Sequence, residues 1–405
     1  MPKPKPAPAR VACTRCDTPM AAAASSTPGP MHASTARQRP TIDPPDPARA
    51  SMRIPPGERP RSRLYQSPPT TARMPDPCPL PLEPILMPKV WGGRRLASLG
   101  KRLPDGANIG ESWELADLGS TSASGGGGDA ARSVIADGTM KGRTLHDALA
   151  AWGGDLLGDA KPSESGGFPL LVKYLDAREH LSVQVHPSPA FAAANPGAHL
   201  KTESWLIVDA EPGAELFIGF RPGVTRETLG DAIRDGTVPS LMRSRPAVPG
   251  ECHTLPSGTV HALGAGVLVA EVQTPSDTTY RLYDWTREYA RPQRELHIEQ
   301  ALACADFGEP PAPVTPDADR TVVARTEYYT MESIRASCKA VDIGGDGPAV
   351  VMLPRTMGAA IASRSGRFDE VMLDRGRTCL IPACLAGDAM LRCGPDTHAV
   401  IARLS

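Results

Sequence analysis

The chain has 405 residues and a formal net charge of −1 at pH 7, which gives no overall preference for nucleic acids or membrane surfaces. Aromatic residues make up only 4% of it, whereas 44 prolines and 38 glycines favour short strands and turns over long helices. No apolar run reaches the roughly 18 residues that a membrane-spanning helix needs, and the length allows two or three domains. The nine scattered cysteines predict reduced thiols and a cytoplasmic location.

Residues 1–73 differ in composition from the rest of the chain. They are dense in Pro, Ala, Ser and Arg and lack aliphatic periodicity, so they cannot bury enough apolar surface to offset the entropy of ordering. We predict a disordered tail. The tail lacks the apolar segment of a secretion signal, and its prolines disfavour the amphipathic helix of a transit peptide. We interpret the segment as an idle tail, or as a spurious extension upstream of a natural start at Met74.

The globular part begins near Pro79. Strands are predicted over 82–86 and 110–115, and a flexible loop over 119–130, whose glycine run lacks the Lys-Ser/Thr ending of a phosphate-binding loop. Apolar residues at helical spacing predict a helix over 145–157. A largely buried strand over 168–175 leads into a strand over 182–187, and another strand follows over 204–208.

The second half alternates between strands and helices before it becomes all-β. A short helix is predicted over 225–235 with Thr225 as its N-cap, then strands over 259–263, 267–273 and 279–285, and a helix over 296–303. A Pro-rich linker over 309–317 separates residues 74–308 from a smaller C-terminal β-domain, residues 318–405. Short strands bounded by turn residues predict sandwiches or barrels, and two in tandem would fit the spacing.

One short strand carries half of a possible metal site. Gln184 and His186 alternate with Val183 and Val185, so both polar side chains project from the same face of the strand. Neighbouring strands would supply the other half, and Glu203 with the later His261 are suitable ligands for a divalent ion. A site of this kind is built across a sheet.

The motifs around these residues resemble a known family. Pro256-x-Gly258-x-x-His261 matches the second signature of the cupin double-stranded β-helix, and Gln184-x-His186 followed by Glu203 takes the place of the first, which normally opens His-x-His. The glutamine is characteristic of the type I mannose-6-phosphate isomerases. Further matching stretches are Trp91-Gly-Gly, Gly110-Glu-Ser-Trp-Glu, Phe168-Pro-Leu-Leu-Val-Lys-Tyr-Leu-Asp-Ala and Glu271-Val-Gln-Thr-Pro-Ser-Asp-Thr-Thr-Tyr-Arg281.

The resemblance extends from about residue 79 to residue 303 and is closest to the compact bacterial form of the enzyme. It implies a mostly β fold, with a cupin jelly roll as the catalytic unit, a few short helices and a smaller C-terminal β-domain. It also implies an isomerase that interconverts mannose 6-phosphate and fructose 6-phosphate through a cis-enediol, supplying mannose and GDP-mannose metabolism.

The same resemblance implies one Zn²⁺ ion per chain. Its ligands would be Gln184, His186, Glu203 and His261. Two imidazoles, one carboxylate and one amide oxygen also suit zinc chemically. Because the glutamine is neutral, the site keeps a net charge of +1, which favours an anionic enediolate.

Several further residues are candidates for catalysis and substrate binding. The resemblance implies that Arg281 stabilises the enediolate or holds the phosphate; the alternative is a structural salt bridge. The base stays open between Glu271, which the resemblance implies, and Lys201, which would share the face of Glu203 on an extended chain. Lys173 and Ser182 are predicted phosphate-binding residues, although a buried lysine could instead form an internal ion pair. The histidines that lie outside any of these motifs are expected in loops or on the surface. They are His180, His199, His253 and His297.

Two other classes of protein remain possible from the sequence. One is a non-catalytic cupin that binds or senses a sugar phosphate, and the other is a cupin oxygenase with Fe²⁺, which the fourth ligand Gln184 disfavours. The expected partner is a small sugar phosphate rather than a nucleic acid or a membrane, and the expected state is a monomer or weak homodimer.

Overall fold

The computed structural model describes residues 75–122, 126–292 and 294–405. The predicted disordered tail and the possible start at Met74 lie outside the described residues. The described part is mostly β, as the composition and the resemblance predict, and its strands form four main sheets.

The sheets are named here in the order in which they stack. Sheet I contains β10 (Met242–Pro246), β9 (Glu215–Phe220), β12 (His261–Leu263), β7 (Val183–Val185) and β14 (Tyr280–Tyr283). Sheet II contains β11 (Cys252–Leu255), β8 (Glu203–Ala210), β13 (Val267–Gln273), β6 (Leu171–Ala177), β2 (Ile85–Gly93) and β3 (Ile109–Leu115).

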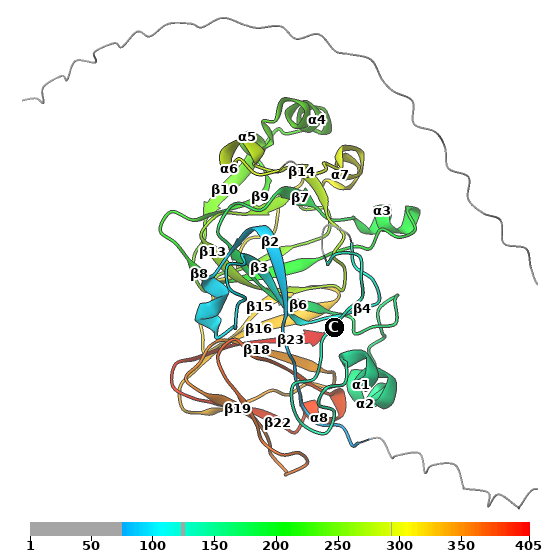
Figure 1. The fold of residues 1–405 in the computed structure, drawn as a ribbon, viewed down its shortest axis with the longest axis vertical. Helices are drawn as coiled ribbons and strands as arrows, with labels where there is room; N and C mark the ends of the chain where they lie inside the picture. Colours follow the sequence, from blue (N-terminus) through cyan, green and yellow to red (C-terminus); the bar gives the residue numbers. More distant parts are fainter. Residues whose placement is uncertain (1–74, 123–125, 293) are drawn as a thin grey trace, which may run out of the picture. The chain divides into compact units, whose positions relative to one another are not determined.

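The other two sheets come mainly from the C-terminal part. Sheet III contains β1 (Leu80–Pro81), β21 (Thr378–Ile381), β18 (Ala349–Arg355), β23 (Thr397–Leu404), β16 (Tyr329–Ala336) and β15 (Arg320–Arg325). Sheet IV contains β17 (Ala340–Asp342), β22 (Ala389–Cys393), β19 (Ala359–Ser363) and β20 (Val371–Leu373). A further small pair joins β4 (Asp117–Leu118) to β5 (Ala131–Arg132). From top to bottom, Figure 1 shows strands of sheets I, II, III and IV in turn.

The alternation of side chains along the strands of sheet II explains how it can pack on both faces. On β8, Trp205 and Ile207 belong to the core shared with sheet I, whereas Leu206 between them belongs to the core shared with sheet III. On β13, Val269 and Ala270 divide in the same way. Because successive side chains of a strand point to opposite faces, sheet II is covered on both sides. Sheets I and II form one sandwich, and sheets III and IV form a second.

The core between sheets II and III crosses the predicted linker. It joins Leu206 and Val272 of sheet II to Tyr329 and Val400 of sheet III. In addition, β1 at the start of the described chain pairs with β21, near the end, through Leu80 and Leu380. The division into domains at residues 309–317 therefore stays a prediction, and extensive packing links the two parts.

The helices are short and lie mostly between strands. They are η1 (Arg95–Leu99), α1 (Leu145–Trp152), α2 (Gly154–Leu157), α3 (Pro189–Ala194), α4 (Arg226–Asp235), α5 (Val238–Leu241), α6 (Thr286–Tyr289), α7 (Ile298–Cys304) and α8 (Ala383–Ala386). The single helix predicted over 145–157 is wrong in detail: it divides at Gly153, whose φ of 49° is not helical. The prediction for α4 is confirmed, because the Thr225 side chain accepts a hydrogen bond from the amide of Thr228.

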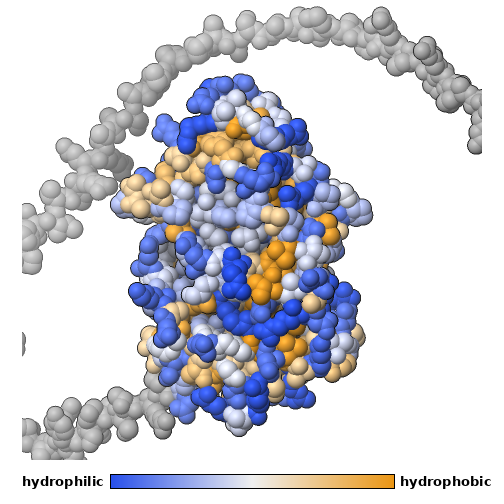
Figure 2. Space-filling view, turned by 180° about the vertical axis from the view of Figure 1, so that it is seen from behind, coloured by the Kyte–Doolittle hydropathy of each residue, from blue (hydrophilic) through white to orange (hydrophobic). Residues whose placement is uncertain are grey.

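Several large apolar side chains are exposed on the surface. On the side shown in Figure 2, hydrophobic patches alternate with hydrophilic ones. The most exposed large apolar residues are Met357 and Met372, at 77% and 70%. Within the described residues, no helix is long and apolar enough to cross a membrane.

Candidate metal centre

Sheet I brings three of the predicted site residues into one row. His261 on β12 pairs with Gln184 on β7, and Gln184 in turn pairs with Arg281 on β14. Directly paired residues on neighbouring strands project from the same face of a sheet. The side chains of these three residues therefore start from adjacent positions, although 97 positions separate Gln184 from Arg281 in the sequence.

Sheet II contributes a second row. Trp205 on β8, Glu271 on β13, Lys173 on β6 and Trp113 on β3 are paired in succession. Glu203 lies two residues before Trp205 and therefore shares its face. The two rows meet where Glu203 approaches His261, with its Oε1 3.1 Å from the ring Nε2.

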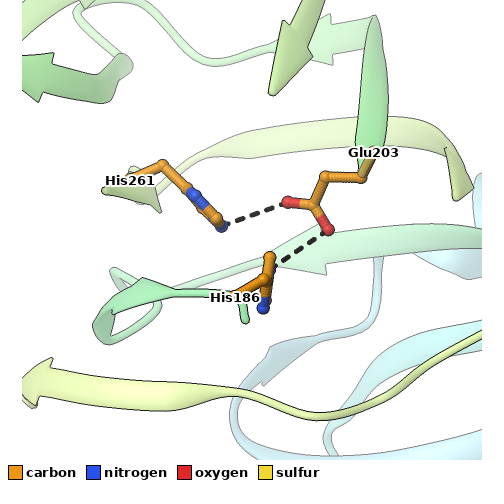
Figure 3. A group of neighbouring side chains, drawn as sticks. All are labelled: His186, Glu203 and His261. Carbon is orange, nitrogen blue, oxygen red and sulfur yellow. Dashed lines mark ion pairs between the residues drawn. The ribbon is translucent and has the colours of Figure 1, made fainter. Parts of the chain in front are cut away.

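Three side chains converge closely enough to hold one metal ion. The ligand atoms of His186, Glu203 and His261 all lie within 4.8 Å of one another, and all three residues are buried. In Figure 3, dashed lines join the carboxylate of Glu203 to each of the two rings. Its Oε2 is 3.4 Å from Nε2 of His186. This arrangement brings two ring nitrogens toward one carboxylate, one from β12 and one from the residue that follows β7.

The hydrogen bonds behind the two rings determine which nitrogens face the carboxylate. Nδ1 of His186 lies 3.0 Å from the carbonyl oxygen of Thr278, and Nδ1 of His261 lies 2.8 Å from that of Thr259. A carbonyl oxygen only accepts, so each Nδ1 carries a proton and donates it. Each Nε2 is left to face Glu203, and partners of this kind are typical behind metal-binding histidines.

The atoms that face one another in the cluster are unprotonated, so a cation between them would be stabilised. Burial, with Lys201 nearby, lowers the pKa of His186 to about 3, so its ring is neutral near pH 7. Burial opposes the charge on Glu203, but Lys201 and His186 hold the pKa of its carboxyl well below the ordinary range. Nε2 of His186 and Oε1 of Glu203 are buried without hydrogen-bond partners among the described residues. Buried acceptors facing each other fit a metal ion.

Gln184 lies at the edge of this cluster. Its Nε2 is 3.3 Å from Nε2 of His261, and its Oε1 accepts a hydrogen bond of 3.3 Å from Ser182. Lys201 lies on the other side, with Nζ 2.7 Å from Oε2 of Glu203. The predicted fourth ligand Gln184 and the candidate base Lys201 thus each contact one of the three clustered residues.

A cavity beside the cluster collects the remaining predicted residues. Its lining includes Lys173, Ser182, Gln184, Lys201, Glu271 and Arg281. All nine residues predicted for the metal, the substrate and catalysis thus lie in the cluster, at its edge or along this cavity.

Comparisons with known proteins agree with this arrangement. A family model described as phosphomannose isomerase type I, catalytic domain, matches residues 81–205. A mannose-6-phosphate isomerase of Streptococcus mutans is 37% identical over 261 residues, which are 62% of this chain and 77% of that protein. The chain belongs to the type I mannose-6-phosphate isomerase family. It is accordingly an enzyme of this isomerase type.

Solved structures of mannose-6-phosphate isomerases share the fold. The enzyme of Bacillus subtilis has a TM-score of 0.65 and 26% identity, over 80% of this chain and 99% of that one. A structure described as a holo, zinc-bound mannose 6-phosphate isomerase has a TM-score of 0.61 and 17% identity, over 80% of this chain and 99% of that one.

Lys173 forms the internal ion pairs that the sequence left as an alternative. Its Nζ is 3.5 Å from Oε2 of Glu111 and 3.3 Å from Oε1 of Glu271. It also lies 5.0 Å from the ring centroid of Trp113. Because Lys173 lines the cavity as well, ion pairing and contact with substrate are compatible.

Several residues that line the cavity are not among the predicted site residues. They are Lys89, Trp91, Glu111, Trp113, Leu175, Leu181, Trp205, Asp277, Thr279 and Arg294. A signal is present for Glu111, which lies in the Gly110-Glu-Ser-Trp-Glu stretch of the family resemblance, although neither the predicted strand nor the resemblance assigns it a role in the site. Nothing in the local pattern around Arg294 indicates its position.

One of the histidines without a matching motif lies elsewhere than predicted. His253 is expected in a loop or on the surface, but it lies on β11 and is 2% exposed. Burial lowers its pKa to about 4. His297 has a supporting contact, since its Nδ1 accepts a hydrogen bond of 3.2 Å from the backbone amide of Arg281.

Glu111 should make a stability contribution that depends on pH. Burial opposes its charge, but Lys89 and Lys173 outweigh this effect and lower the pKa of Glu111 from 4.5 to about 2. A depressed carboxyl pKa stabilises the fold above the unfolded pKa, and this stabilisation is lost as the pH falls from 4.5 toward 2. We expect Glu111→Gln to lower the free energy of unfolding, and we expect this destabilisation to be roughly 2 kcal/mol smaller at about pH 3 than at about pH 6.

Urea unfolding of the wild-type protein and of Glu111→Gln, at about pH 6 and pH 3, measures this effect. The exposed Glu83 provides the control, because Glu83→Gln removes a solvent-accessible carboxylate from the same part of the chain. A Glu111→Gln protein whose destabilisation is the same at both pH values would contradict the assignment.

Proposed function

We propose that the enzyme interconverts mannose 6-phosphate and fructose 6-phosphate through a cis-enediol, at one Zn²⁺ held by His186, Glu203, His261 and Gln184. The observation that carries the proposal is the buried cluster of two ring nitrogens and one ionised carboxylate within 4.8 Å. Zinc in a solved structure of the same fold supports this choice of metal. The amide of Gln184 contacts Nε2 of His261, the ring nitrogen that also faces Glu203. Gln184 would complete the set of four ligands through its amide oxygen.

The donor set suits zinc by its chemistry. Neutral imidazole and carboxylate are common zinc ligands, and a fourth neutral oxygen leaves the ion net positive. When bound, the ion supplies positive charge that stabilises the oxygen on which negative charge develops. The protein groups around it have the remaining tasks: binding the phosphate, orienting the sugar and moving the proton between C2 and C1.

Two residues are candidates for moving this proton. Burial raises the pKa of Glu271, although Lys173 opposes the shift. Its Oε2 accepts a hydrogen bond of 2.8 Å from Trp205, which fixes the carboxyl group in the cavity wall. A carboxyl pKa closer to the working pH suits a group that both accepts and returns a proton. Lys201, beside Glu203, is the second candidate.

The cations of the cavity have complementary roles. Arg281 is 4% exposed and has no carboxylate partner within ion-pair distance among the described residues. Its guanidinium is suited to stabilising the enediolate or to holding the phosphate. Lys173 on β6 of sheet II and Ser182, the residue directly before β7 of sheet I, are proposed to bind the phosphate. A cytoplasmic location and a monomeric or weakly dimeric state stay predictions.

The zinc-dependent reaction is tested by metal analysis together with a coupled assay for fructose 6-phosphate formation. We expect about one zinc per chain and turnover that is lost with a chelator and restored by Zn²⁺. Full activity without zinc would contradict the metal assignment, and a zinc-loaded protein that forms no fructose 6-phosphate would contradict the proposed reaction.

A further inference from the structure

A tyrosine of the C-terminal part reaches the strands that carry the site. Tyr329 is the first residue of β16 in sheet III and is fully buried. Its ring belongs to the core between sheets II and III. Its hydroxyl lies 2.9 Å from the backbone carbonyl oxygen of Val272 on β13 and 3.0 Å from Oγ of Ser204 on β8. One hydroxyl group therefore contacts two neighbouring strands of sheet II.

The direction of each hydrogen bond follows from the number of protons. The carbonyl of Val272 can only accept, so Tyr329 donates its one hydroxyl proton there. Ser204 must then donate to the oxygen of Tyr329. Oγ1 of Thr254 on β11, at 3.3 Å, is left to donate to Ser204. The chain of bonds runs from β11 through β8 and β16 to β13.

The two anchored positions adjoin residues of the proposed site. Ser204 directly follows Glu203, and Val272 directly follows Glu271. Ser204 and Val272 are also paired with each other across β8 and β13. Because side chains alternate along a strand, Tyr329 binds the back of sheet II while Glu203 and Glu271 project from the front. A shift of either strand would move a carboxylate that faces the site.

We propose that Tyr329 is a positioning residue for the metal centre, and that the C-terminal β part thereby sets the geometry of Glu203 and Glu271. The proposal rests on the proposed function, since it assumes that Glu203 binds zinc. It gives the C-terminal part a role in the reaction, although no residue from 318–405 lines the cavity described above. Outer contacts of this kind orient metal ligands in other proteins.

The test compares two variants of full-length protein. Tyr329→Phe removes both hydroxyl contacts and keeps the ring in the core. Ser333→Ala is the matched control, because Ser333 lies on the same strand and is fully buried, and its hydroxyl contacts Nε2 of His398 within sheet III, at 2.9 Å. Each variant loses a buried hydrogen-bonding hydroxyl, so a general loss of stability should lower the melting temperature of both.

The readouts are zinc affinity, from competition with a coloured chelator, and kcat and KM measured separately. For Tyr329→Phe we expect the zinc dissociation constant to rise about tenfold and kcat to fall by a similar factor, with KM little changed. For Ser333→Ala we expect both values to stay at those of the unchanged protein. Equal zinc affinity and kcat in the two variants would overturn the proposal.

Two further measurements keep the outcome decisive. If Tyr329→Phe fails to fold, Ser204→Ala removes one of the two contacts and should still weaken zinc binding; unchanged affinity would then overturn the proposal. Zinc content and turnover of the unchanged protein are measured in the same series. An unchanged protein that turns over substrate without zinc would reject the proposed function, whereas a zinc enzyme unaffected by loss of the hydroxyl would reject only the role of Tyr329.

Discussion

Glu203→Gln protein is expected to be purified almost without zinc and to lose turnover by a factor on the order of a thousand, which corresponds to roughly 4 kcal/mol of transition-state stabilisation. Glu203 supplies the negative charge of the cluster, and one of its oxygens approaches His186 while the other approaches His261. Glutamine keeps the size of the side chain but not the charge. The change also leaves the ammonium group of Lys201 without its carboxylate partner at 2.7 Å.

The matched control for Glu203→Gln is Glu332→Gln. Glu332 is also largely buried, at 8% exposure, and pairs with Arg320 and Arg403 in sheet III. Loss of that carboxylate should lower stability but leave zinc content and turnover near their original values. Metal analysis and the coupled assay give both numbers. Glu203→Gln protein that keeps its zinc and most of its turnover would show that Glu203 is not a ligand.

Arg281→Ala protein is expected to keep its zinc and to lose kcat/KM by about a hundredfold to a thousandfold, the usual effect of removing one donor that stabilises a developing negative charge. Burial, with Arg294 nearby, lowers the pKa of Arg281 to about 10, so its guanidinium is still charged near pH 7. Its Nε is buried without a hydrogen-bond partner among the described residues. A buried charge without an acidic partner is costly unless a ligand pairs with it.

The kinetic constants of the Arg281→Ala protein also separate the two roles that the sequence leaves open. A fall in kcat with little change in KM would indicate stabilisation of the enediolate, and a rise in KM with kcat unchanged would indicate binding of the phosphate. Arg320→Ala is the control, because Arg320 pairs with Glu332 within sheet III and does not line the cavity. Unchanged kcat and KM in Arg281→Ala would remove this residue from the site.

Much of the proposed site was predictable because its signals are local. The alternation that places Gln184 and His186 on one face is a property of any strand, and Pro256-x-Gly258-x-x-His261 is a turn followed by a strand within six residues. The same holds for β13, whose predicted bounds of 267–273 agree with the structure. The helix over 145–157 failed because one glycine outweighed the apolar spacing.

Residues whose role depends on distant strands were beyond the reach of the sequence. Glu111 enters the cavity because β3 pairs with β6 and places its carboxylate near Lys173, and no spacing within either strand reveals that pairing. His253 reads as an ordinary polar residue, yet β11 at the edge of sheet II buries it. Burial and pairing are properties of the assembled sheets, so single segments do not encode them visibly.

By itself, the sequence determined the mostly β architecture, the family and the residues proposed for the metal, because strand alternation and short motifs act over a few neighbouring positions. Only the tertiary structure decided which charges meet across the sheets, where Lys173 finds its two carboxylates, and that Tyr329 contacts β8 and β13 from behind. The physical reason is distance along the chain: 57 positions separate Val272 from Tyr329, and only the packing of sheet II on sheet III brings them together.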